Sequence, residues 1–507
     1  MTRLPVVSVL SLALLARSLS AQEHVHAQSA TEKLGTVHFR TSCSPSVAPQ
    51  FDRAVALLHS FEFGSSIKGF SDVLAADSTC AMARWGIALA QWSNPFVASA
   101  RSAALLQRGK LAADDAARLG SRATEREREY IAAVQTLYTD VEHVDQRTRV
   151  VAYEHAMADL VAKQPADTEA KIFYALSLAA SALPTDKTYA NQLKAGAILE
   201  PLWALQPDHP GLAHYIIHSY DYPPLAAKAK AAAARYASIA PSAAHALHMP
   251  SHTFTRVGMW QESIDANRRS IAVATQSGAI GEALHGSDYL EYAYLQMGND
   301  SAAKAVLDGL PALAARFDPN TIAGAAPPAA AVFAIAAIPA RYALERGAWA
   351  DAAALESHAS AFPWADAITY FARALGAARL GDTARARASV DALASIRVRL
   401  ATMGEAYWAE QVAIQQLGAE AWIDLAERNQ ARALMRMREA VTREDATDKS
   451  AVTPGPLAPA RELLGDMLAQ LGRPAEALAE YRASLVKEPN RHHSLQAISG
   501  SSTSSRR

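Results

Sequence analysis

The densest group of residues that could do chemistry lies between His209 and Tyr294, which contains seven of the sixteen histidines. His214 and His218 are four residues apart, and the same pair recurs thirty-four residues later as His248 and His252. Residues four apart share one face of an α-helix, so each pair presents two imidazoles in one direction. Imidazole nitrogens bind zinc, copper, nickel and iron. The pattern therefore predicts a transition-metal site.

A segment near the C-terminus sets the same register without any histidine. Positions 8, 15, 20 and 32 of the tetratricopeptide (TPR) consensus, a helix-turn-helix repeat of about 34 residues, are filled there by Gly465, Gly472, Ala477 and Pro489. Gly258 and Gly298 mark the turns of two further repeats, and Gly381 follows Gly347 by thirty-four residues. The sequence thus predicts an all-α fold, a TPR-type helix-turn-helix solenoid (α-α superhelix), in which each helix pair packs on the next.

In this register the histidines lie on the first helix of successive repeats, which begin at Pro210, Ala244 and Leu284. Position 5 of the three repeats is His214, His248 and Asp288; position 9 is His218, His252 and Tyr292; position 2 is Gly211, His245 and His285. Packed helices lie about 8–10 Å apart, so side chains of neighbouring first helices can converge. We expect the four histidines at positions 5 and 9 to surround one centre, extended by one turn through His245 and His285.

Two carboxylates accompany these histidines. Asp221 follows His218 by about one helical turn, and Asp288 occupies position 5 of the third repeat. Either could serve as a metal ligand, a general base or the hydrogen-bond acceptor that orients a ligating imidazole.

The helix that carries the second pair contains a proline. Pro250 lies between His248 and His252, and inside a helix it would remove a hydrogen bond and kink the chain. Alternatively Pro250 stands in the first turn of a helix that begins near Met249, and His245 and His248 then belong to a preceding loop. Both readings are open at this point.

An interpretation without metal also fits the pattern. A repeat can be duplicated together with its histidines, which would then pack only against the aromatic neighbours Tyr215, Tyr220, Phe254 and Trp260. In that case the concave groove of the solenoid would bind an extended peptide or a partner protein, with the histidines as hydrogen-bonding contacts.

Three other residues are given no metal-binding role. His209 immediately precedes the first histidine-bearing repeat and is interpreted as a loop residue. His59 and Glu62 end the first predicted helix and are interpreted as surface residues.

Composition excludes several classes of protein. The formal charge is −1, with both signs dispersed along the chain, and a nucleic-acid-binding protein usually has a strong basic excess. Phosphate-binding glycine loops, nucleophile elbows and His-Glu-x-x-His motifs do not occur. We expect no nucleic-acid partner, and these motifs do not identify an enzyme.

The N-terminus has the features of a secretory signal peptide. Arg3 precedes a short apolar run that ends at Ala16, and cleavage could follow Ala21 or Ala27. Such a run is too short to span a bilayer, and no later run is long enough, so we expect an exported, periplasmic or secreted protein without a transmembrane segment. In an oxidising compartment the two cysteines, Cys43 and Cys80, form either a disulfide or two buried thiols.

The segments predicted from these patterns are a signal peptide at 1–27, a flexible leader at 28–46, an N-terminal TPR-like array at 47–307 with the histidine-bearing repeats at 210–307, an Ala/Gly/Pro-rich loop at 308–331, a C-terminal TPR-like array at 332–491 and a disordered tail at 492–507. The polar loop 445–459 is expected to fold back over the groove.

Four segments carry a family resemblance: 51–61, 80–83, His214 to Asp221 and His245 to His252. They resemble those of a large group of exported bacterial TPR proteins, and the resemblance covers most of the chain after the signal peptide. It implies the fold and, through that fold, protein interaction. The feature specific to this chain is the predicted transition-metal site. Zinc with an open coordination position would support hydrolysis, and copper or iron would support redox chemistry.

Overall fold

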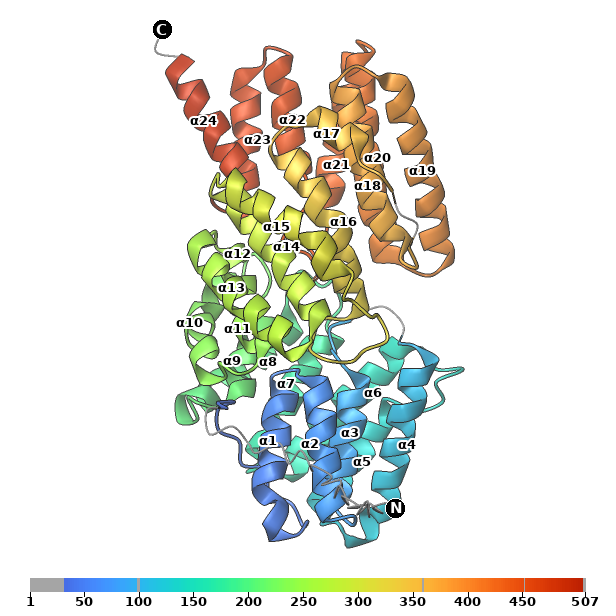
Figure 1. Ribbon diagram of the computed structural model, residues 1–507, viewed down its shortest axis with the longest axis vertical. Helices are drawn as coiled ribbons and strands as arrows, with labels where there is room; N and C mark the ends of the chain where they lie inside the picture. The colour runs from blue at the N-terminus through green and yellow to red at the C-terminus, as the bar shows by residue number, and fades with distance from the viewer. Residues whose placement is uncertain (1–31, 98–100, 358–359, 451, 505–507) are drawn as a thin grey trace, which may run out of the picture. The chain divides into compact units, whose positions relative to one another are not determined.

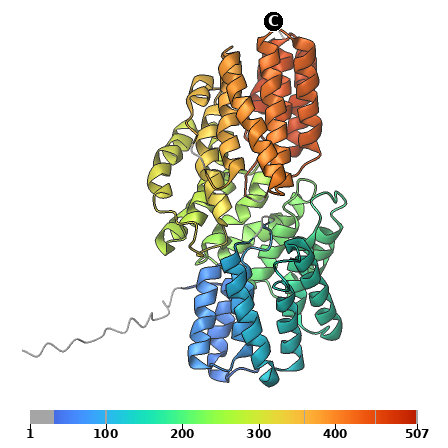
Figure 2. The same cartoon turned by 90° about the vertical axis from the view of Figure 1, so that its right-hand side faces the viewer.

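The expected all-α fold is confirmed. The structure is a computed structural model that describes residues 32–97, 101–357, 360–450 and 452–504. Every regular element within these ranges is a helix, and none of their residues is in a strand. From Lys33 onward the chain forms one compact unit of successive antiparallel helices, numbered along the chain in Figure 1 and seen from a second side in Figure 2.

The helices fall into three groups along the sequence. The first group is α1 Ala48–His59, α2 Phe63–Ala76, α3 Ala81–Trp92, α4 Ala103–Leu119, α5 Glu125–Thr136, α6 Gln146–Lys163, α7 Thr168–Ser181 and α8 Ala190–Leu205. The histidine-bearing group is α9 Pro210–Ser219, α10 Lys230–Ile239, α11 Ala244–His248, α12 Pro250–Arg256, α13 Trp260–Ser277, α14 Ile280–Gln296 and α15 Asp300–Ala314. The last group is α16 Pro328–Glu345, α17 Trp349–Ala354, α18 Pro363–Arg379, α19 Thr383–Thr402, α20 Ala406–Ala426, α21 Gln430–Asp445, α22 Ala460–Gln470, α23 Pro474–Lys487 and α24 His492–Ser504. Short 3-10 helices occur at Pro45–Val47, Gly120–Arg122 and Ala226–Ala229.

The turn glycines account for the antiparallel pairing. Gly258 joins α12 to α13 with φ +68°, and Gly472 joins α22 to α23 with φ +72°. This left-handed backbone conformation is open to glycine at no steric cost and strained for most other residues. The glycines therefore reverse the chain where the TPR register predicts a turn.

The apolar core is not continuous. One cluster extends from Leu34 to Phe254 and a second from Phe333 to Tyr481. The helices between them, α13 to α15, contribute only small apolar clusters. Buried polar side chains are numerous in this part of the chain, and they include the histidines of α11, α12 and α14. A polar interior of this kind must satisfy its own hydrogen bonds and charges.

Pro250 is the first residue of α12 and does not lie inside a longer helix. Pro is tolerated in a first turn because no intrahelical N–H bond is needed there. Met249, between α11 and α12, has helical backbone angles of φ −53° and ψ −34°. His245 and His248 therefore lie on a short helix of their own, α11, where the sequence offered only a kinked helix or a loop.

The structure departs from the expected segments at both ends. Residues 33–46, expected to be flexible, lie against the first helices and bury Leu34, Val37 and Phe39. The ring of Phe39 lies 5.3 Å from that of Trp85. Near the C-terminus, residues 492–504 form α24 in place of a disordered tail. Short-range composition does not reveal either segment, because distant helices supply the surfaces on which it packs.

The proline-rich loop is shorter than expected. Helix α15 continues to Ala314 with Pro311 inside it, and α16 starts at Pro328, so only 315–327 of the expected loop 308–331 is irregular. The expected signal peptide at 1–27, its cleavage site, and the ends of the leader and tail at 28–31 and 505–507 lie outside the described residues.

Cys43 and Cys80 form a disulfide that closes a segment of 37 residues. Cys80 directly precedes α3, while Cys43 lies in the N-terminal segment before the 3-10 helix Pro45–Val47. The bond therefore attaches residues 33–43 to the first helices, which resolves the two alternatives for the cysteines in favour of the oxidised pair.

One described helix, α16, is long and apolar enough to cross a membrane, with a mean hydropathy of 1.2 over 18 residues. Over half of that window, 56%, is buried against other helices, and its Arg341 is fully buried. The core helix of a globular protein has the same length and composition, so burial accounts for the apolar character of α16.

Candidate metal centre

Six histidines meet in the interior of the histidine-bearing repeats, and each is at most 7% exposed. They are His214 and His218 of α9, His245 and His248 of α11, His252 of α12 and His285 of α14. They form two sets, and within each set the candidate ligand atoms lie within 4.8 Å of one another. Site 1 contains His214, His218 and His245, and site 2 contains His248, His252 and His285.

The grouping differs from the single centre expected from the sequence. Each site takes positions 5 and 9 from one repeat and position 2 from the next repeat. Adjacent first helices pack side by side, and the position-2 side chain closes the open side of the preceding pair. The four histidines at positions 5 and 9 are thus divided between two sites. His245 belongs to the first site and His285 to the second, whereas both were expected to extend a single site.

The Nε2 atoms of site 1 have the clearest need for a ligand. In all three residues, His214, His218 and His245, this nitrogen is buried and has no hydrogen-bond partner among the described residues. An unsatisfied buried polar atom costs about 1–3 kcal/mol. Three such atoms directed into one small space would be satisfied together by a metal ion.

The opposite ring nitrogens of site 1 are held by the protein. The Nδ1–H of His214 donates to the carbonyl oxygen of His59 at 2.6 Å, and the Nδ1–H of His245 donates to Glu282 Oε1 at 2.8 Å. A proton on Nδ1 leaves the lone pair on Nε2, which is the arrangement of metal-ligating histidines.

His218 is positioned by stacking. Its ring lies 4.1 Å from the ring of Phe96, nearly parallel at 17°, and 5.6 Å from that of Phe61 in the turn between α1 and α2. Aromatic contacts therefore restrict the orientation of this imidazole.

Site 2 also combines three imidazoles, but here the buried nitrogen without a hydrogen-bond partner among the described residues is Nδ1 of His285. The Nε2 atoms of His248 and His252 are 3.1 Å apart, close to the roughly 3.3 Å that separates two ligands of a tetrahedral zinc with Zn–N bonds near 2.0 Å. The Nδ1–H of His248 donates to Asn267 Oδ1 at 2.7 Å, and that of His252 donates to Asp221 Oδ2 at 2.9 Å. The ring of His285 lies 4.5 Å from that of His248 and completes the set.

The two candidate carboxylates have different surroundings. Asp221 lies behind His252, where it accepts the Nδ1–H and also binds Arg256 Nε at 2.9 Å. It thus orients a candidate ligand. Asp288 is not part of either site, because it pairs with Arg341 of α16. The sequence could not show this, since Arg341 comes from a helix fifty residues later in the chain.

Burial keeps the imidazoles neutral. It lowers the pKa of all six site histidines. Neighbouring imidazoles lower the pKa further in five of them, and the charges of Lys449 and Arg256 do so for His252. The pKa of His248 falls to about 3. For His252 the charge of Asp221 opposes burial in part, but its pKa still lies below the usual value. Neutral imidazole is the form that binds a metal ion, so protons do not compete for these sites near pH 7.

Two buried carboxylates next to site 1 lack a cationic partner. Glu62 accepts a hydrogen bond from the backbone N–H of His245, and Glu282 accepts from its Nδ1. In the part of the chain that the structure describes, no lysine or arginine pairs with either. Burial and the charge of Glu282 raise the pKa of Glu62 to about 8, and burial raises that of Glu282. A cation at site 1 would compensate both.

A third group contains His59, Glu169 and His209. Here the two Nε2–H groups donate to the carboxylate oxygens at 3.0 Å each, and the hydroxyl of Tyr215 donates to His59 Nδ1 at 3.0 Å. Direct hydrogen bonds therefore satisfy the ring nitrogens of this cluster except Nδ1 of His209, which is buried without a partner among the described residues. This cluster also helps to position site 1, because His59 provides the backbone carbonyl that accepts the hydrogen bond from His214.

The positions of His59 and Glu62 correct the sequence interpretation. His59 is fully buried and Glu62 is 8% exposed, although both were expected at the surface. His209 is a loop residue directly before α9, as expected, and it is 1% exposed. The burial of His59 and Glu62 could have been predicted from the run 57–63, in which these polar residues stand among four large apolar residues that need a core.

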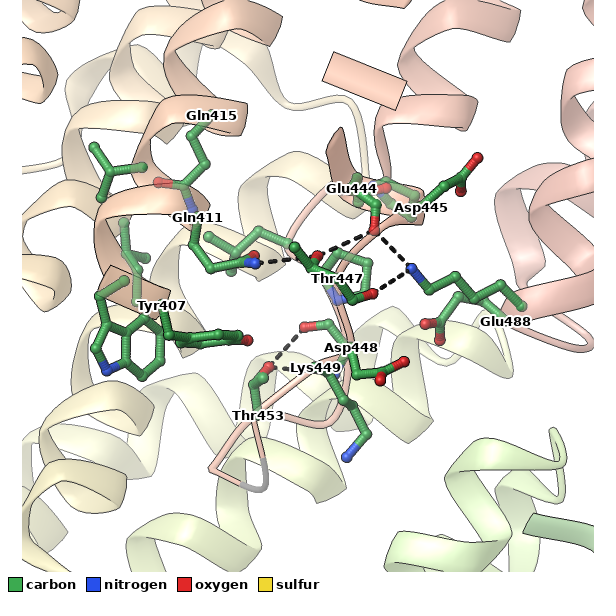
Figure 3. A pocket seen from close by; sticks show the side chains of 18 of the residues that line it. Tyr407, Gln411, Gln415, Glu444, Asp445, Thr447, Asp448, Lys449, Thr453 and Glu488 are labelled. Atoms are coloured by element: carbon green, nitrogen blue, oxygen red, sulfur yellow. Dashed lines mark hydrogen bonds between the residues drawn. The ribbon is translucent and has the colours of Figure 1, made fainter. Parts of the chain in front are cut away.

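The loop between α21 and α22 covers the histidine repeats, as the sequence predicted. The Tyr289 hydroxyl donates to the carbonyl of Thr453 at 3.2 Å, and Lys449 Nζ lies 3.4 Å from the same hydroxyl. On its other side the loop lines a pocket with Tyr407, Gln411 and Glu444, shown in Figure 3. There the Lys449 side chain points away from Glu444, toward the helices of the histidine repeats.

No protein-family model and no curated protein sequence matches this chain. Solved structures similar to it include yeast Tom70, with 12% identity over 91% of this chain and 96% of that chain and a TM-score of 0.38. The APC/C hetero-tetramer Cut9–Hcn1 has 13% identity over 83% and 76% of the two chains and a TM-score of 0.36. The human IFIT1 dimer with m7Gppp-AAAA has 9% identity over 80% and 89% and a TM-score of 0.33. We draw nothing about function from similarities at this level.

Proposed function

We propose that this chain binds a transition-metal ion at site 1, through the Nε2 atoms of His214, His218 and His245. The observation that carries the proposal is the convergence of three buried imidazole nitrogens without hydrogen-bond partners in the described residues. Fixed Nδ1–H groups on two of the rings and the uncompensated carboxylates Glu62 and Glu282 support it.

Zinc, copper and iron are the candidate ions. The donor set is three neutral imidazoles without a thiolate, and zinc and copper both accept such a set. The ligands are at most 7% exposed, so a substrate larger than a small molecule does not reach the ion in this conformation. Binding of the ion, and not turnover of a large substrate, is therefore the activity that we propose.

A protein-interaction role fits the helix-pair scaffold and is the second candidate. A protein-interaction role in which the site histidines contact a bound peptide is not supported, because these side chains lie in the interior. A partner would dock on exposed helix faces and leave the metal sites untouched.

We also infer that the protein works outside the cytoplasm. The apolar N-terminal run has the composition of a signal peptide, and the Cys43–Cys80 disulfide is of the kind that persists in oxidising compartments. Fractionation of cells that express the full chain, with thiol labelling of each fraction, tests this. Full-length protein with free thiols in the cytoplasm would contradict it.

Metal analysis of protein purified without a histidine tag tests the proposed function. The purified protein, or apoprotein reconstituted with zinc, is expected to hold at least one ion per chain. His218→Phe keeps the stacking on Phe96 and removes the ligand nitrogen, so we expect it to lose one ion per chain. His155→Phe is the matched control, because the His155 side chain is 72% exposed and lies outside both sites.

Two results would overturn the proposal. One is reconstituted wild-type protein without stoichiometric metal. The other is a folded His218→Phe variant that binds as many ions, equally tightly, as the wild type. A circular dichroism spectrum of the variant that matches the wild type shows that it is folded.

A further inference from the structure

We infer that site 2 binds a second metal ion next to the first, more weakly, because Lys449 places a positive charge beside it. This inference rests on the proposed function of site 1. It adds the number of ions, their order of binding and the residue that makes the two sites unequal.

Site 2 is built for a ligand in the same way as site 1. Its two closest nitrogens, Nε2 of His248 and His252, are 3.1 Å apart. Asn267 and Asp221 hold the Nδ1 atoms on the far sides of these rings. Asn267 is itself held, since its amide nitrogen donates to the carbonyl of Ser263 at 2.8 Å, which orients the amide oxygen toward His248. The lone pairs of both Nε2 atoms are thereby directed at one another, an arrangement that a shared cation would stabilise.

The two sites are neighbours. The ring of His245 in site 1 lies 6.0 Å from that of His248 in site 2, and the rings of His218 and His252 are 6.4 Å apart. Two ions at these sites would repel each other in a dry interior. The site with more negative charge around it therefore fills first.

The charges around the sites differ. Beside site 1, Glu62 and Glu282 have no cationic partner in the described part of the chain. Beside site 2, Asp221 is already compensated by Arg256 at 2.9 Å and by Lys449, whose Nζ lies 3.7 Å from Oδ2. A further carboxylate, Glu488, lies near both Arg256 and Lys449 and balances the charge of Lys449. Site 1 thus has two carboxyl groups that no cationic side chain pairs with in the described residues, so an ion bound there would favour their ionised form. The carboxylate beside site 2 is already paired with two cationic side chains.

Lys449 is held where it acts most strongly on site 2. It belongs to the loop between α21 and α22 (Figure 3). Its side chain is only 5% exposed. Its Nζ donates to the hydroxyl of Tyr289 at 3.4 Å, and the Tyr289 ring stacks on His252 at 4.9 Å. A positive charge in this buried position opposes a divalent cation on the adjacent imidazoles with little screening by water.

Titration of the apoprotein with zinc alone, by calorimetry and by competition with a chromophoric chelator, tests the inference. We expect two ions per chain in two resolved steps. Lys449→Met removes the charge and keeps the aliphatic stem, so it should tighten the second step by about tenfold or more and leave the first within about twofold. Lys187→Met is the matched control, because Lys187 pairs with Asp448 of the same loop but is 40% exposed.

A second variant tests the inference without Lys449. His285→Ala is expected to remove the second step and leave the first, because His285 belongs to site 2 alone. One ion per chain, two indistinguishable steps, no response to Lys449→Met, or loss of the first step in His285→Ala would each overturn the inference while site 1 still binds zinc. Loss of the proposed function has a different signature, namely the absence of the tight first step in the wild type.

Discussion

His245 and His248 lie on one short helix, α11, with their rings 6.0 Å apart, yet they belong to different sites. His245 reaches back to the histidines of α9, and His248 reaches forward to those of α12 and α14. The five-residue helix is separate because Pro250 starts α12 immediately after it. A small change in α11 would therefore alter both sites at once.

Glu282 is expected to support zinc binding at site 1 although it is not a ligand. Its Oε1 holds the Nδ1–H of His245 at 2.8 Å, and its charge is uncompensated among the described residues. Glu282→Gln should weaken the tight step of a zinc titration about tenfold to a hundredfold, as is typical when the partner of a ligating histidine is changed. The exposed Glu262→Gln on α13 is the control. Unchanged affinity in Glu282→Gln would show that this hydrogen bond does not matter.

Gly211 is expected to be irreplaceable by alanine. It occupies position 2 of its repeat, where the next two repeats have His245 and His285, and a Cβ there would lie 2.5 Å from Nδ1 of the buried His59. Gly211→Ala should lower the free energy of unfolding by about 1–3 kcal/mol, the usual cost of overpacking a core.

Urea unfolding followed by circular dichroism measures this effect. Gly309→Ala on α15 is the control, because a Cβ there meets nothing within 4 Å and should be neutral or stabilising. Since His59 also provides the carbonyl that holds His214, zinc binding at site 1 should weaken in Gly211→Ala but not in Gly309→Ala. Equal stability of the two variants would mean that the His59 ring moves aside at no cost.

Loss of the disulfide is expected to destabilise the first helices. The Cys43–Cys80 bond links residues 37 apart in the sequence and restricts the unfolded chain. Its loss gives the unfolded chain more conformational freedom, which lowers the free energy of unfolding by about 2–4 kcal/mol. The Cys43→Ser, Cys80→Ser double variant should have a free energy of unfolding lower by that amount and should therefore unfold at a lower urea concentration. Wild-type protein unfolded in reducing buffer should match the variant, and a wild type whose stability is the same with and without reductant would refute the prediction.

The C-terminal helix α24 is expected to loosen at alkaline pH. Burial alone would lower the pKa of His493, but its hydrogen bond to Asp466 at 2.8 Å and the charges of Asp466, Glu462 and Glu345 raise the pKa to about 9. A folded-state pKa above the ordinary 6.5 means that the stabilisation is complete below pH 6.5 and is lost as the pH rises toward 9.

Hydrogen exchange of α24, corrected for the intrinsic rate at each pH, measures this loss. Protection should fall between pH 6.5 and pH 9 in the wild type. Asp466→Asn removes the partner charge, so its protection should be lower at pH 6.5 and should change less with pH. An α24 that exchanges equally at both pH values in the wild type would be inconsistent with the ion pair.

The sequence by itself determined the repeat and the face on which the histidines lie. Gly258 and Gly472 reverse the chain where the register predicts turns, because a left-handed backbone excludes most other residues. The i, i+4 spacing of His214 and His218 put both on one side of α9, since helical geometry is local. These features depend on residues within one repeat and could be predicted from it.

Only the tertiary structure decided how the histidines divide into sites and what surrounds them. His245 joins His214 and His218 because α11 packs beside α9, and Asp288 is taken by Arg341 from α16. His59 enters the core from a helix about 150 residues earlier, and Lys449 reaches site 2 from a loop about 200 residues later. Such contacts depend on where distant helices come to lie, and a spacing within one repeat contains no information about them. The number of ions and their order of binding are therefore properties of the packing.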